Sequence, residues 1–390
     1  EILNRKKRKS SLPSIFKTDS HEFSGTKEIA DQFCNFFTNI GPNLAKKIPN
    51  SDRSHQSFLP GKLVNSIFLE DVNQQEILEI CNTFRSGTAT GYDNISMSSI
   101  KDAIELISSP LMHLINLSIR SGIVPHQLKI ARVLPLYKSG ERDIFTNYRP
   151  VSVLPAFSKF WERVVYNRLL KFLNKYNILS DSQYGFRKNN STAYALTYLY
   201  DKISSAIDNK EITVGIFIDL SKAFDTVDHK ILLEKLEHYG IRDVALSWFK
   251  SYLNNREQFV DLNCQRSSFS KVECGVPQGS ILGPLLFLIY INDLSNISKV
   301  LDFILFADDT NIFFSHKDIN ILSETLNSEL STLTQWCNAN KLSINFKKSN
   351  YMIFMPRQKR QRLDVLININ NNKIERVKET VFLGVILDEN

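Results

Sequence analysis

The sequence predicts an α+β fold whose centre is a split βαβ sheet of the ferredoxin-like type. Apolar strands and amphipathic helices alternate from about residue 118 onward, without an internal repeat. A β-rich run over residues 213–219 ends in a carboxylate, and a helical pattern that Gly240 stops follows it. Two apolar strands, 303–306 and 311–314, then flank a short Ala-Asp-Asp-Thr turn, which predicts a tight hairpin.

Other segments complete the order strand, helix, hairpin, helix, strand. A leucine repeat from Leu322 to Trp336 predicts the second helix, and strands are expected over residues 342–346 and 351–355. Residues 240–300 would then form an insertion between the first helix and the hairpin. Upstream, apolar residues recur every three or four positions over residues 155–176, which predicts one further helix.

The chain has 390 residues, of which 43% are hydrophobic, so it is long enough to bury a large core. We expect three parts. Residues 1–60 would form an N-terminal linker and accessory helix, with the helix over 29–48 and a polar, Ser- and Pro-containing linker from residue 51. Residues 61–117 would be an extension that leads into the main domain, which would occupy residues 118–387.

Composition restricts the partners and the compartment. A net charge of +7 favours a polyanionic partner only modestly. No apolar run approaches the roughly 18 residues that span a bilayer, and no apolar signal core follows Glu1, so no membrane association is expected. Because the first residue is not Met, we interpret the chain as a fragment of a longer protein. The five cysteines lack zinc-ligand spacing and are expected to be reduced thiols.

The predicted sheet would bring three carboxylates together. Asp219 ends the first strand, and Asp308 with Asp309 forms the hairpin turn beside it. Close carboxylates repel one another unless divalent cations lie between them, and hard oxygen ligands suit Mg²⁺. Two such ions would suit an in-line phosphoryl displacement. An Asp-Asp pair taken alone has a simpler explanation, because paired Asp residues often only form turns.

A collinear series of short motifs resembles the reverse transcriptases of non-LTR (LINE-type) retrotransposons. The series comprises Gly-Tyr-Asp-Asn-Ile at 91–95, the finger segments at 136–140 and 147–150, Gln-Tyr-Gly-Phe-Arg at 183–187, motif A (Phe-Ile-Asp-Leu-Ser-Lys-Ala-Phe-Asp) at 217–225, motif B (Gly-Val-Pro-Gln-Gly-Ser) at 275–280, motif C (Phe-Ala-Asp-Asp-Thr) at 306–310, motif D at 345–354 and motif E at 382–385. The resemblance therefore extends from about residue 90 to the end of the chain.

This resemblance implies a right-hand polymerase with a split βαβ palm, helical fingers and an N-terminal helical extension, with the thumb only beginning at the C-terminal end. It also implies two Mg²⁺ ions, or Mn²⁺ in their place. Asp219 and Asp308 would be the principal metal ligands and Asp309 the third carboxylate.

The resemblance further assigns residues to the nucleotide. Phe224 would be the steric gate that excludes a 2′-hydroxyl and so favours deoxynucleotides, although Phe224 on its own would be read as a core residue. Gln278 and Gly279 would lie in a loop that approaches the nascent base pair, where glycine removes the side-chain obstacle. Taken alone, the same Gly-x-Pro-x-Gly sequence is typical of an ordinary turn.

Three cations complete the expected site. Lys138 and Arg149 are candidates to hold the triphosphate, because both are suited to a dispersed anionic charge. Lys348 is the candidate general acid for pyrophosphate, with Lys347 as the alternative. Each of these side chains also fits an ordinary solvated surface charge.

The partners implied are an RNA template, a DNA primer and dNTPs, in a protein of the nucleus and cytoplasm. The basic runs 5–9 and 357–362 would either contact phosphates or remain solvated. Two other functions stay open: an RNA-dependent RNA polymerase, against which Phe224 argues, and a catalytically inactive or domesticated RNA-binding derivative.

Overall fold

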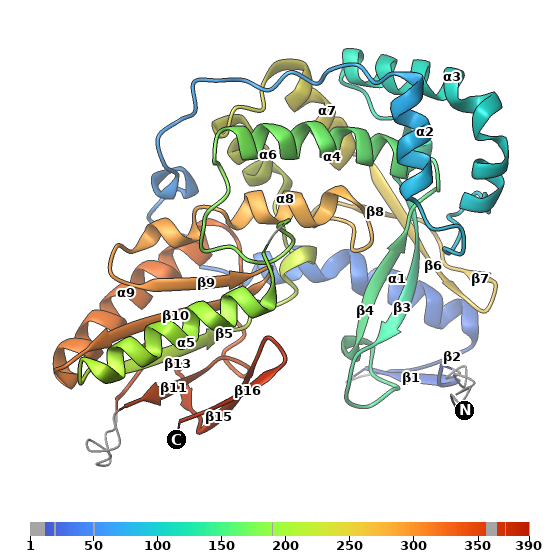
Figure 1. The fold of residues 1–390 in the computed structure, drawn as a ribbon. Coiled ribbons are helices and arrows are strands. Elements are labelled where there is room, and N and C mark those ends of the chain that lie inside the picture. The colour runs from blue at the N-terminus through green and yellow to red at the C-terminus, as the bar shows by residue number, and fades with distance from the viewer. Residues whose placement is uncertain are drawn as a thin grey trace, which may run out of the picture.

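The computed structural model describes residues 12–18, 21–49, 51–188, 190–355, 365–370 and 372–389. Both basic runs considered above therefore lie outside the described residues. Helices and strands are mixed along the chain, as an α+β fold requires (Figure 1). The longer helices are α1 (Thr26–Ala45), α2 (Gln74–Thr83), α3 (Met97–Ser121), α4 (Ser158–Lys175), α5 (Thr192–Asp208), α6 (His229–His238), α7 (Asp243–Leu253), α8 (Leu282–Ile291) and α9 (Ile319–Ala339).

A five-stranded sheet lies at the centre of the fold, with the strand order β14-β11-β5-β10-β9. Strand β5 pairs antiparallel with both β10 and β11, and β9 and β10 form the predicted hairpin. Strand β14 joins β11 in parallel at the edge. The strands are β5 (Ile212–Ile218), β9 (Asp302–Phe306), β10 (Asp309–His316), β11 (Asn350–Phe354) and β14 (Glu375–Arg376).

Every residue of β5 is buried because both faces of the sheet are covered. Alternate residues Ile212, Val214, Ile216 and Ile218 face a large core that includes the leucines of α9. Phe217 points to the opposite face, where it meets α5, which crosses that face of the sheet (Figure 1). The sequence of β5 therefore does not alternate between apolar and polar residues, as it would if one face of the sheet were exposed.

One expected strand is wrong. Residues 342–346 do not form a strand; their only sheet-like contact is an isolated bridge between Ile344 and Leu220. The reason is local, because the chain turns at once: the amides of Lys348 and Ser349 both donate to the carbonyl of Asn345, at 3.0 Å. The regular strand begins only at Asn350.

A second sheet has the order β4-β3-β6-β7, with β8 also pairing with β6. Strands β3 and β6 are parallel, so residues from the expected insertion at 240–300 complete a sheet begun much earlier in the chain. The short strands β1 and β2 form a separate hairpin, and two more hairpins lie near the C-terminus. The bounds are β1 (Ile15–Lys17), β2 (Glu22–Ser24), β3 (Ile130–Tyr137), β4 (Tyr148–Val153), β6 (Arg256–Leu262), β7 (Gln265–Arg266), β8 (Ser270–Val272), β12 (Asn368–Ile369), β13 (Asn372–Lys373), β15 (Glu379–Phe382) and β16 (Val385–Asp388).

The N-terminal helix α1 packs on this second sheet. Phe33 on α1 lies 5.1 Å from the ring of Tyr148 on β4 and 4.7 Å from that of Phe145, measured between ring centroids. The stretch from residue 51, expected to be a linker, contains a short helix η1 (His55–Phe58). Phe58 is buried there, so part of this stretch packs onto the body of the protein.

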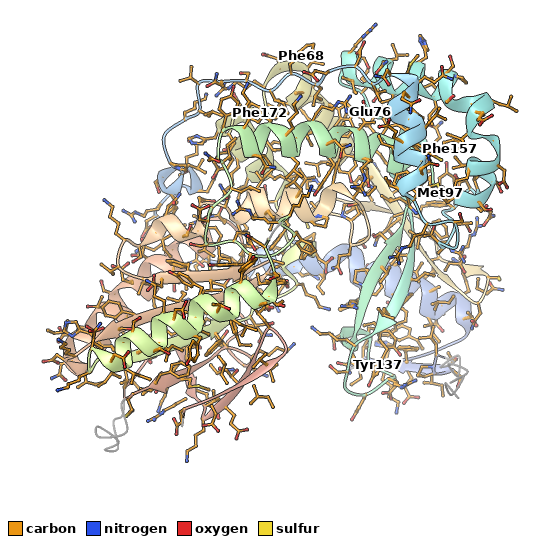
Figure 2. All side chains as sticks on the ribbon, viewed as in Figure 1. Phe68, Glu76, Met97, Tyr137, Phe157 and Phe172 are labelled. Carbon is orange, nitrogen blue, oxygen red and sulfur yellow. The ribbon has the colours of Figure 1, made fainter. Side chains whose placement is uncertain are left out.

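Helices α2, α3 and α4 form a third region, apart from both sheets. Arg168 of α4 forms a two-pronged ion pair with Glu76 of α2, and one of its contacts measures 2.7 Å. Glu76 lies on the helix next to α4, as Figure 2 shows. No helix among the described residues is both long and apolar enough to traverse a lipid bilayer.

A fully buried ion pair joins three helical elements under the central sheet. Lys235 on α6 pairs with Asp293, and both side chains are 0% exposed. Trp336 on α9 donates from Nε1 to the other carboxylate oxygen of Asp293, at 2.9 Å. Removing one partner would leave the other charge buried without compensation, which is the costly way to break such a pair.

We therefore predict that Asp293→Ala lowers the free energy of unfolding by about 3–5 kcal/mol. The measurement is the midpoint of chemical denaturation for wild type and variant. Replacing both partners, with Lys235→Met and Asp293→Leu, should cost less than the single change, because no charge is then left alone. In the exposed pair between Lys341 and Asp228, Lys341→Ala should cost only about 0–1 kcal/mol. A loss of equal size in all three proteins would contradict the prediction.

Candidate active site

Strand pairing places the three predicted carboxylates at one end of the strands of the central sheet, which we call the carboxylate edge. Thr310 of β10 lies opposite Ile218 of β5, so Asp309 and Asp219, the next residues outward, follow at the same edge. Asp309 also pairs with Phe306, which leaves Ala307 and Asp308 as the two residues of the hairpin turn. Asp219 and the hairpin turn are therefore neighbours at the ends of paired strands.

Gln183 fixes the backbone of this turn by hydrogen bonds. Its carbonyl oxygen Oε1 accepts hydrogen bonds from the amides of Ala307, at 3.0 Å, and Gly185, at 2.8 Å. Ala307 has a φ of +56°, a conformation that costs energy in any residue except glycine. A Cβ on Gly185 would lie 2.3 Å from the amide nitrogen of Ala307, so only glycine fits there. Gln183 thus fixes the backbone that carries Asp308.

Crowded negative charge shows in the pKa values. Partial burial and the charge of Asp219 raise the pKa of Asp308. Partial burial, the charge of Asp308 and the charge of Asp219 together raise the pKa of Asp309 to about 6. Asp309 is itself an exposed residue, and we attribute much of its shift to the two neighbouring carboxylates.

Asp219 is oriented by Asn345, the residue at which the chain turns before β11. Asn345 donates from its side-chain Nδ2 to Asp219 Oδ2 at 2.9 Å, and its backbone amide donates to the Asp219 carbonyl at 2.8 Å. Sequence reasoning had given this residue no role. The only signal was its place at the start of the motif D segment.

The donor set suits a hard divalent cation, because carboxylate oxygens are the ligands that Mg²⁺ prefers. Within the part of the chain that the structure describes, none of the three carboxylates takes part in an ion pair. No group of three or more Asp, Glu, His or Cys side chains in that part is arranged closely enough to hold an ion as it stands. The carboxylates are thus neighbours without a closed ligand shell, which agrees with uncompensated repulsion among them.

Phe224 and the loop with Gln278 lie side by side. Phe224 stacks on Phe287 of α8 with ring centroids 4.3 Å apart, and the ring of Phe186 meets its edge at 6.3 Å. It is half-buried rather than a full core residue. The amide of Val276 donates to the Phe224 carbonyl at 2.9 Å, which ties the loop to the residue.

Gly279 is required by the tight fit of this loop against β4. Its φ is +127°, and a Cβ there would lie 2.4 Å from the carbonyl oxygen of Ser152. The amide of Ser152 donates to the carbonyl of Gln278 at 2.8 Å. A residue larger than glycine would push the loop off the strand.

The structure brings two of the three predicted cations toward the site. Lys138 follows β3 and is exposed, and its positive charge lowers the pKa of both Asp308 and Asp309. Lys348 is exposed, as is Lys347, and the charge of Lys348 acts on Lys222. Arg149 is exposed on β4, and its side chain forms no ion pair or hydrogen bond with any described residue.

Lys222 is a fourth cation, which sequence reasoning missed although it lies inside motif A. Its Nζ donates to the carbonyl of Tyr148 at 3.2 Å. Burial lowers the pKa of Lys222, Asp225 opposes that shift, and the charges of Lys138 and Lys348 add to it. Lys138 and Lys348, which come from separate segments, are therefore both close enough to Lys222 for their charges to act on it.

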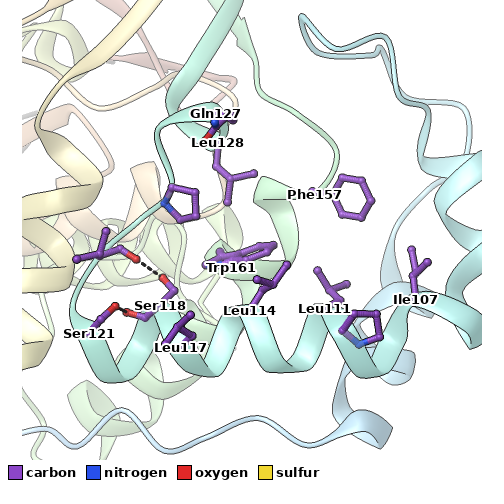
Figure 3. A pocket seen from close by; sticks show the side chains of 13 residues that line it. Ile107, Leu111, Leu114, Leu117, Ser118, Ser121, Gln127, Leu128, Phe157 and Trp161 are labelled. Carbon is purple, nitrogen blue, oxygen red and sulfur yellow. Dashed lines mark hydrogen bonds between the residues drawn. The ribbon is translucent and has the colours of Figure 1, made fainter.

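An open apolar cavity lies in another part of the molecule. It has a volume of about 720 Å³ and lies between α3, the short helix η2 (His126–Lys129) and α4. Leu111, Leu114 and Trp161 line it, as Figure 3 shows. None of the predicted site residues lines this cavity, so it is separate from the carboxylate edge.

The chain is similar in sequence to known proteins. A sequence model of the family described as "Reverse transcriptase (RNA-dependent DNA polymerase)" matches residues 137–387. The chain is 30% identical over 338 residues to the "Probable RNA-directed DNA polymerase from transposon BS" of Drosophila melanogaster, which covers 83% of this chain and 36% of that protein. It is 27% identical over 344 residues to the "RNA-directed DNA polymerase from mobile element jockey" of the same species, covering 86% and 37%.

A more distant relative is the "Retrovirus-related Pol polyprotein from type-1 retrotransposable element R2" of Popillia japonica, which is 24% identical over 250 residues, covering 60% of this chain and 34% of that protein. The chain spans little more than a third of the length of these relatives. Because the family match extends over more than half of the chain, the chain belongs to the reverse transcriptase family, and its named relatives place it among the enzymes of non-LTR retrotransposons.

Proposed function

We propose that this chain is the polymerase region of an RNA-directed DNA polymerase of a non-LTR retrotransposon. It would extend a DNA primer along an RNA template with dNTPs, in the nucleus and cytoplasm. The observation that carries the proposal is the location of Asp219, Asp308 and Asp309 at one edge of the sheet, in a chain of the reverse transcriptase family. Activities outside this third of the relatives' length form no part of the proposal.

The fold supports a division into palm and fingers. The chain order β5, β9, β10, β11 and the spatial order β11-β5-β10-β9 are those of a split βαβ unit, which we assign to the palm. The β3–β4 hairpin, with Tyr137 near its free end in Figure 2, would belong to the fingers. We retain residues 118–387 as the polymerase domain, 61–117 as its extension and 1–60 as the N-terminal region.

Asp219 and Asp308 would hold two Mg²⁺ ions, or Mn²⁺, with Asp309 as the third carboxylate. When bound, the ions would activate the primer 3′-hydroxyl and neutralise charge on the triphosphate and the departing pyrophosphate. The protein would contribute orientation: Asn345 fixes the carboxylate of Asp219, and Gln183 fixes the turn that carries Asp308.

The cations would bind the triphosphate. The charges of Lys138 and Lys348 disfavour the protonated form of Lys222 in the nucleotide-free protein, so a polyanion that enters among the three would relieve that repulsion. Lys348 would be the candidate to protonate pyrophosphate. Arg149 remains a proposed phosphate contact, which an exposed side chain on β4 would reach only by turning toward the site.

Phe224 would exclude a ribose 2′-hydroxyl, because a ring stacked on Phe287 resists displacement. Gln278 and Gly279 would border the nascent base pair. These contacts separate the proposal from an RNA-dependent RNA polymerase, which must accept the 2′-hydroxyl. A catalytically inactive RNA-binding derivative would need none of the three carboxylates, all of which the sequence retains.

Asp308→Ala should lower the rate of primer extension by at least about a hundredfold, because it removes several kcal/mol of metal-assisted stabilisation. The assay is incorporation of dNTPs on a primed RNA template with Mg²⁺. Asp302→Asn is the matched control: it lies at the other end of β9, where it pairs with Lys202, and should stay within about twofold of wild type. Equal activity in wild type and Asp308→Ala would contradict the proposal. Template binding without any extension in wild type would favour the inactive derivative.

Phe224→Ala should raise the incorporation of rNTPs relative to dNTPs by about tenfold or more, since the obstacle to the 2′-hydroxyl is removed. Single-nucleotide extension with each substrate measures the ratio. Phe269→Ala, an exposed aromatic residue outside the site, serves as control. An unchanged ratio in Phe224→Ala would exclude Phe224 as the gate.

Asp309→Asn should stabilise the metal-free protein above pH 6. The pKa of Asp309 is about 6 in the folded chain against 3.8 as the ordinary value, so the folded state holds this proton more tightly. Stability is therefore lost as pH rises from 3.8 to 6, and the neutral amide avoids that loss. Thermal midpoints at pH 4 and pH 8, with and without Mg²⁺, give the measurement.

We expect the two proteins to differ little at pH 4, and the variant to be more stable than wild type at pH 8 without metal. Mg²⁺ should stabilise wild type more than the variant at pH 8. A variant that is less stable than wild type at pH 8 without metal would contradict the repulsion described here.

A further inference from the structure

Two loops beside the nucleotide site are joined by a compact set of hydrogen bonds. The loop after β5 holds Phe224 and Asp225, and the loop before α8 holds Gln278. The amide of Gly275 donates to the carbonyl of Val227 at 2.8 Å, in addition to the Val276–Phe224 bond. One bond joins side chains from both loops: Gln278 Nε2 donates to Asp225 Oδ1 at 2.8 Å.

The backbone at Asp225 is closely enclosed. A Cβ on Gly275 would lie 2.9 Å from the carbonyl oxygen of Asp225, and a Cβ on Gly41 of α1 would lie 2.4 Å from it. The thiol of Cys274 donates to the same carbonyl at 3.4 Å. Asp225 is thus held in place by two separate segments, so its carboxylate can act as a fixed point for Gln278.

The charge state of Asp225 decides which end of Gln278 faces it. Burial raises the pKa of Asp225 to about 6, against the hydrogen bond from Gln278 and the charge of Lys222, which lower it. At neutral pH the group is therefore ionised and accepts hydrogen bonds only. The amide of Gln278 must then present Nε2 to Asp225, which leaves its carbonyl oxygen Oε1 on the opposite side.

A purely structural role explains the carboxylate poorly. Oδ2 of Asp225 is buried and has no hydrogen-bond partner among the described residues. A buried carboxylate with an unpaired oxygen costs stability, so an apolar residue of similar size would suit the loop better if folding were its only task. Among the described residues Lys222 forms no ion pair with Asp225, and its Nζ donates to the carbonyl of Tyr148 instead.

We infer that Asp225 is a positioning residue for the incoming nucleotide, which holds Gln278 with its carbonyl oxygen turned away from Asp225 as an acceptor for the bound nucleotide. The same Gln278–Asp225 bond also ties the loop that contains Phe224, the residue before Asp225, to the loop of Gln278. This inference rests on the proposed function, because it assigns a role within the same nucleotide site. Asp225 acts through Gln278 and does not itself touch the substrate.

The test is a double-mutant cycle on nucleotide binding without chemistry. A complex of the protein with an RNA template and a dideoxy-terminated DNA primer binds the next dNTP but cannot react. The resistance of this complex to dissociation by a competitor nucleic acid is measured as the concentration of dNTP, or of the matching rNTP, is raised. Asp225→Ala and Gln278→Ala should each weaken dNTP binding by up to about tenfold, the usual effect of losing one hydrogen bond. The double variant should be no worse than Gln278→Ala alone.

The conservative change Asp225→Asn keeps an acceptor oxygen for Gln278 but adds a competing donor, so it should restore part of the dNTP affinity and of the preference over rNTP. Asp201→Asn, an exposed residue on α5, should match wild type. Thermal midpoints of all variants identify any that fail to fold. Losses that add in the double variant, or an Asp225→Asn protein as weak as Asp225→Ala, would overturn the inference.

The outcome is separable from that of the proposed function. A wild-type protein that forms the complex with dNTP yet never extends a reactive primer would contradict the proposed activity. The double-mutant cycle on dNTP binding could still be interpreted. Normal extension with additive losses in the cycle would retain the activity and remove the role of Asp225. A wild-type protein that binds no dNTP in the complex would contradict both.

Discussion

Mutual repulsion among Asp219, Asp308 and Asp309 is the constraint on which the rest of the site depends. Burial and the charges of neighbouring carboxylates raise the pKa of Asp308 and of Asp309. The surrounding chain holds them there with neutral donors: Asn345 on Asp219, and Gln183 on the turn at Ala307. The negative charge is thereby left uncompensated by direct ion pairs, which is the condition for divalent cations to bind.

Like charges are also crowded among the residues expected to bind the nucleotide. Lys138 and Lys348 lie on separate segments from Lys222, whose pKa is lowered first by burial and further by the charges of these two lysines. Opposed clusters of like charge, acidic at the sheet edge and basic beside it, destabilise the protein without ligand. Metal ions and a triphosphate together would satisfy both. Stability for this arrangement comes from elsewhere, in the covered sheet and the buried pair of Lys235 with Asp293.

Much of this was accessible from the sequence. The apolar run before Asp219, the hairpin about Asp308 and the leucine repeat of α9 each predicted an element that the structure contains within a few residues. The strand predicted over 342–346 failed because apolar alternation cannot register that Asn345 turns the chain to reach Asp219. Part of the predicted linker packs against the protein, because a single phenylalanine, Phe58, finds a buried place.

By itself the sequence determined the elements, the family resemblance and the residue types of the chemistry, since these depend on local periodicity and on short motifs. Only the tertiary structure decided which charges meet. Lys222, Asn345 and Asp225 lie within the matched motifs, but nothing in those motifs indicated their neighbours Lys138, Asp219 and Gln278, which lie far away along the chain. Electrostatic coupling and hydrogen bonding act over a few ångströms of space, so they follow from the fold and not from spacing in the chain.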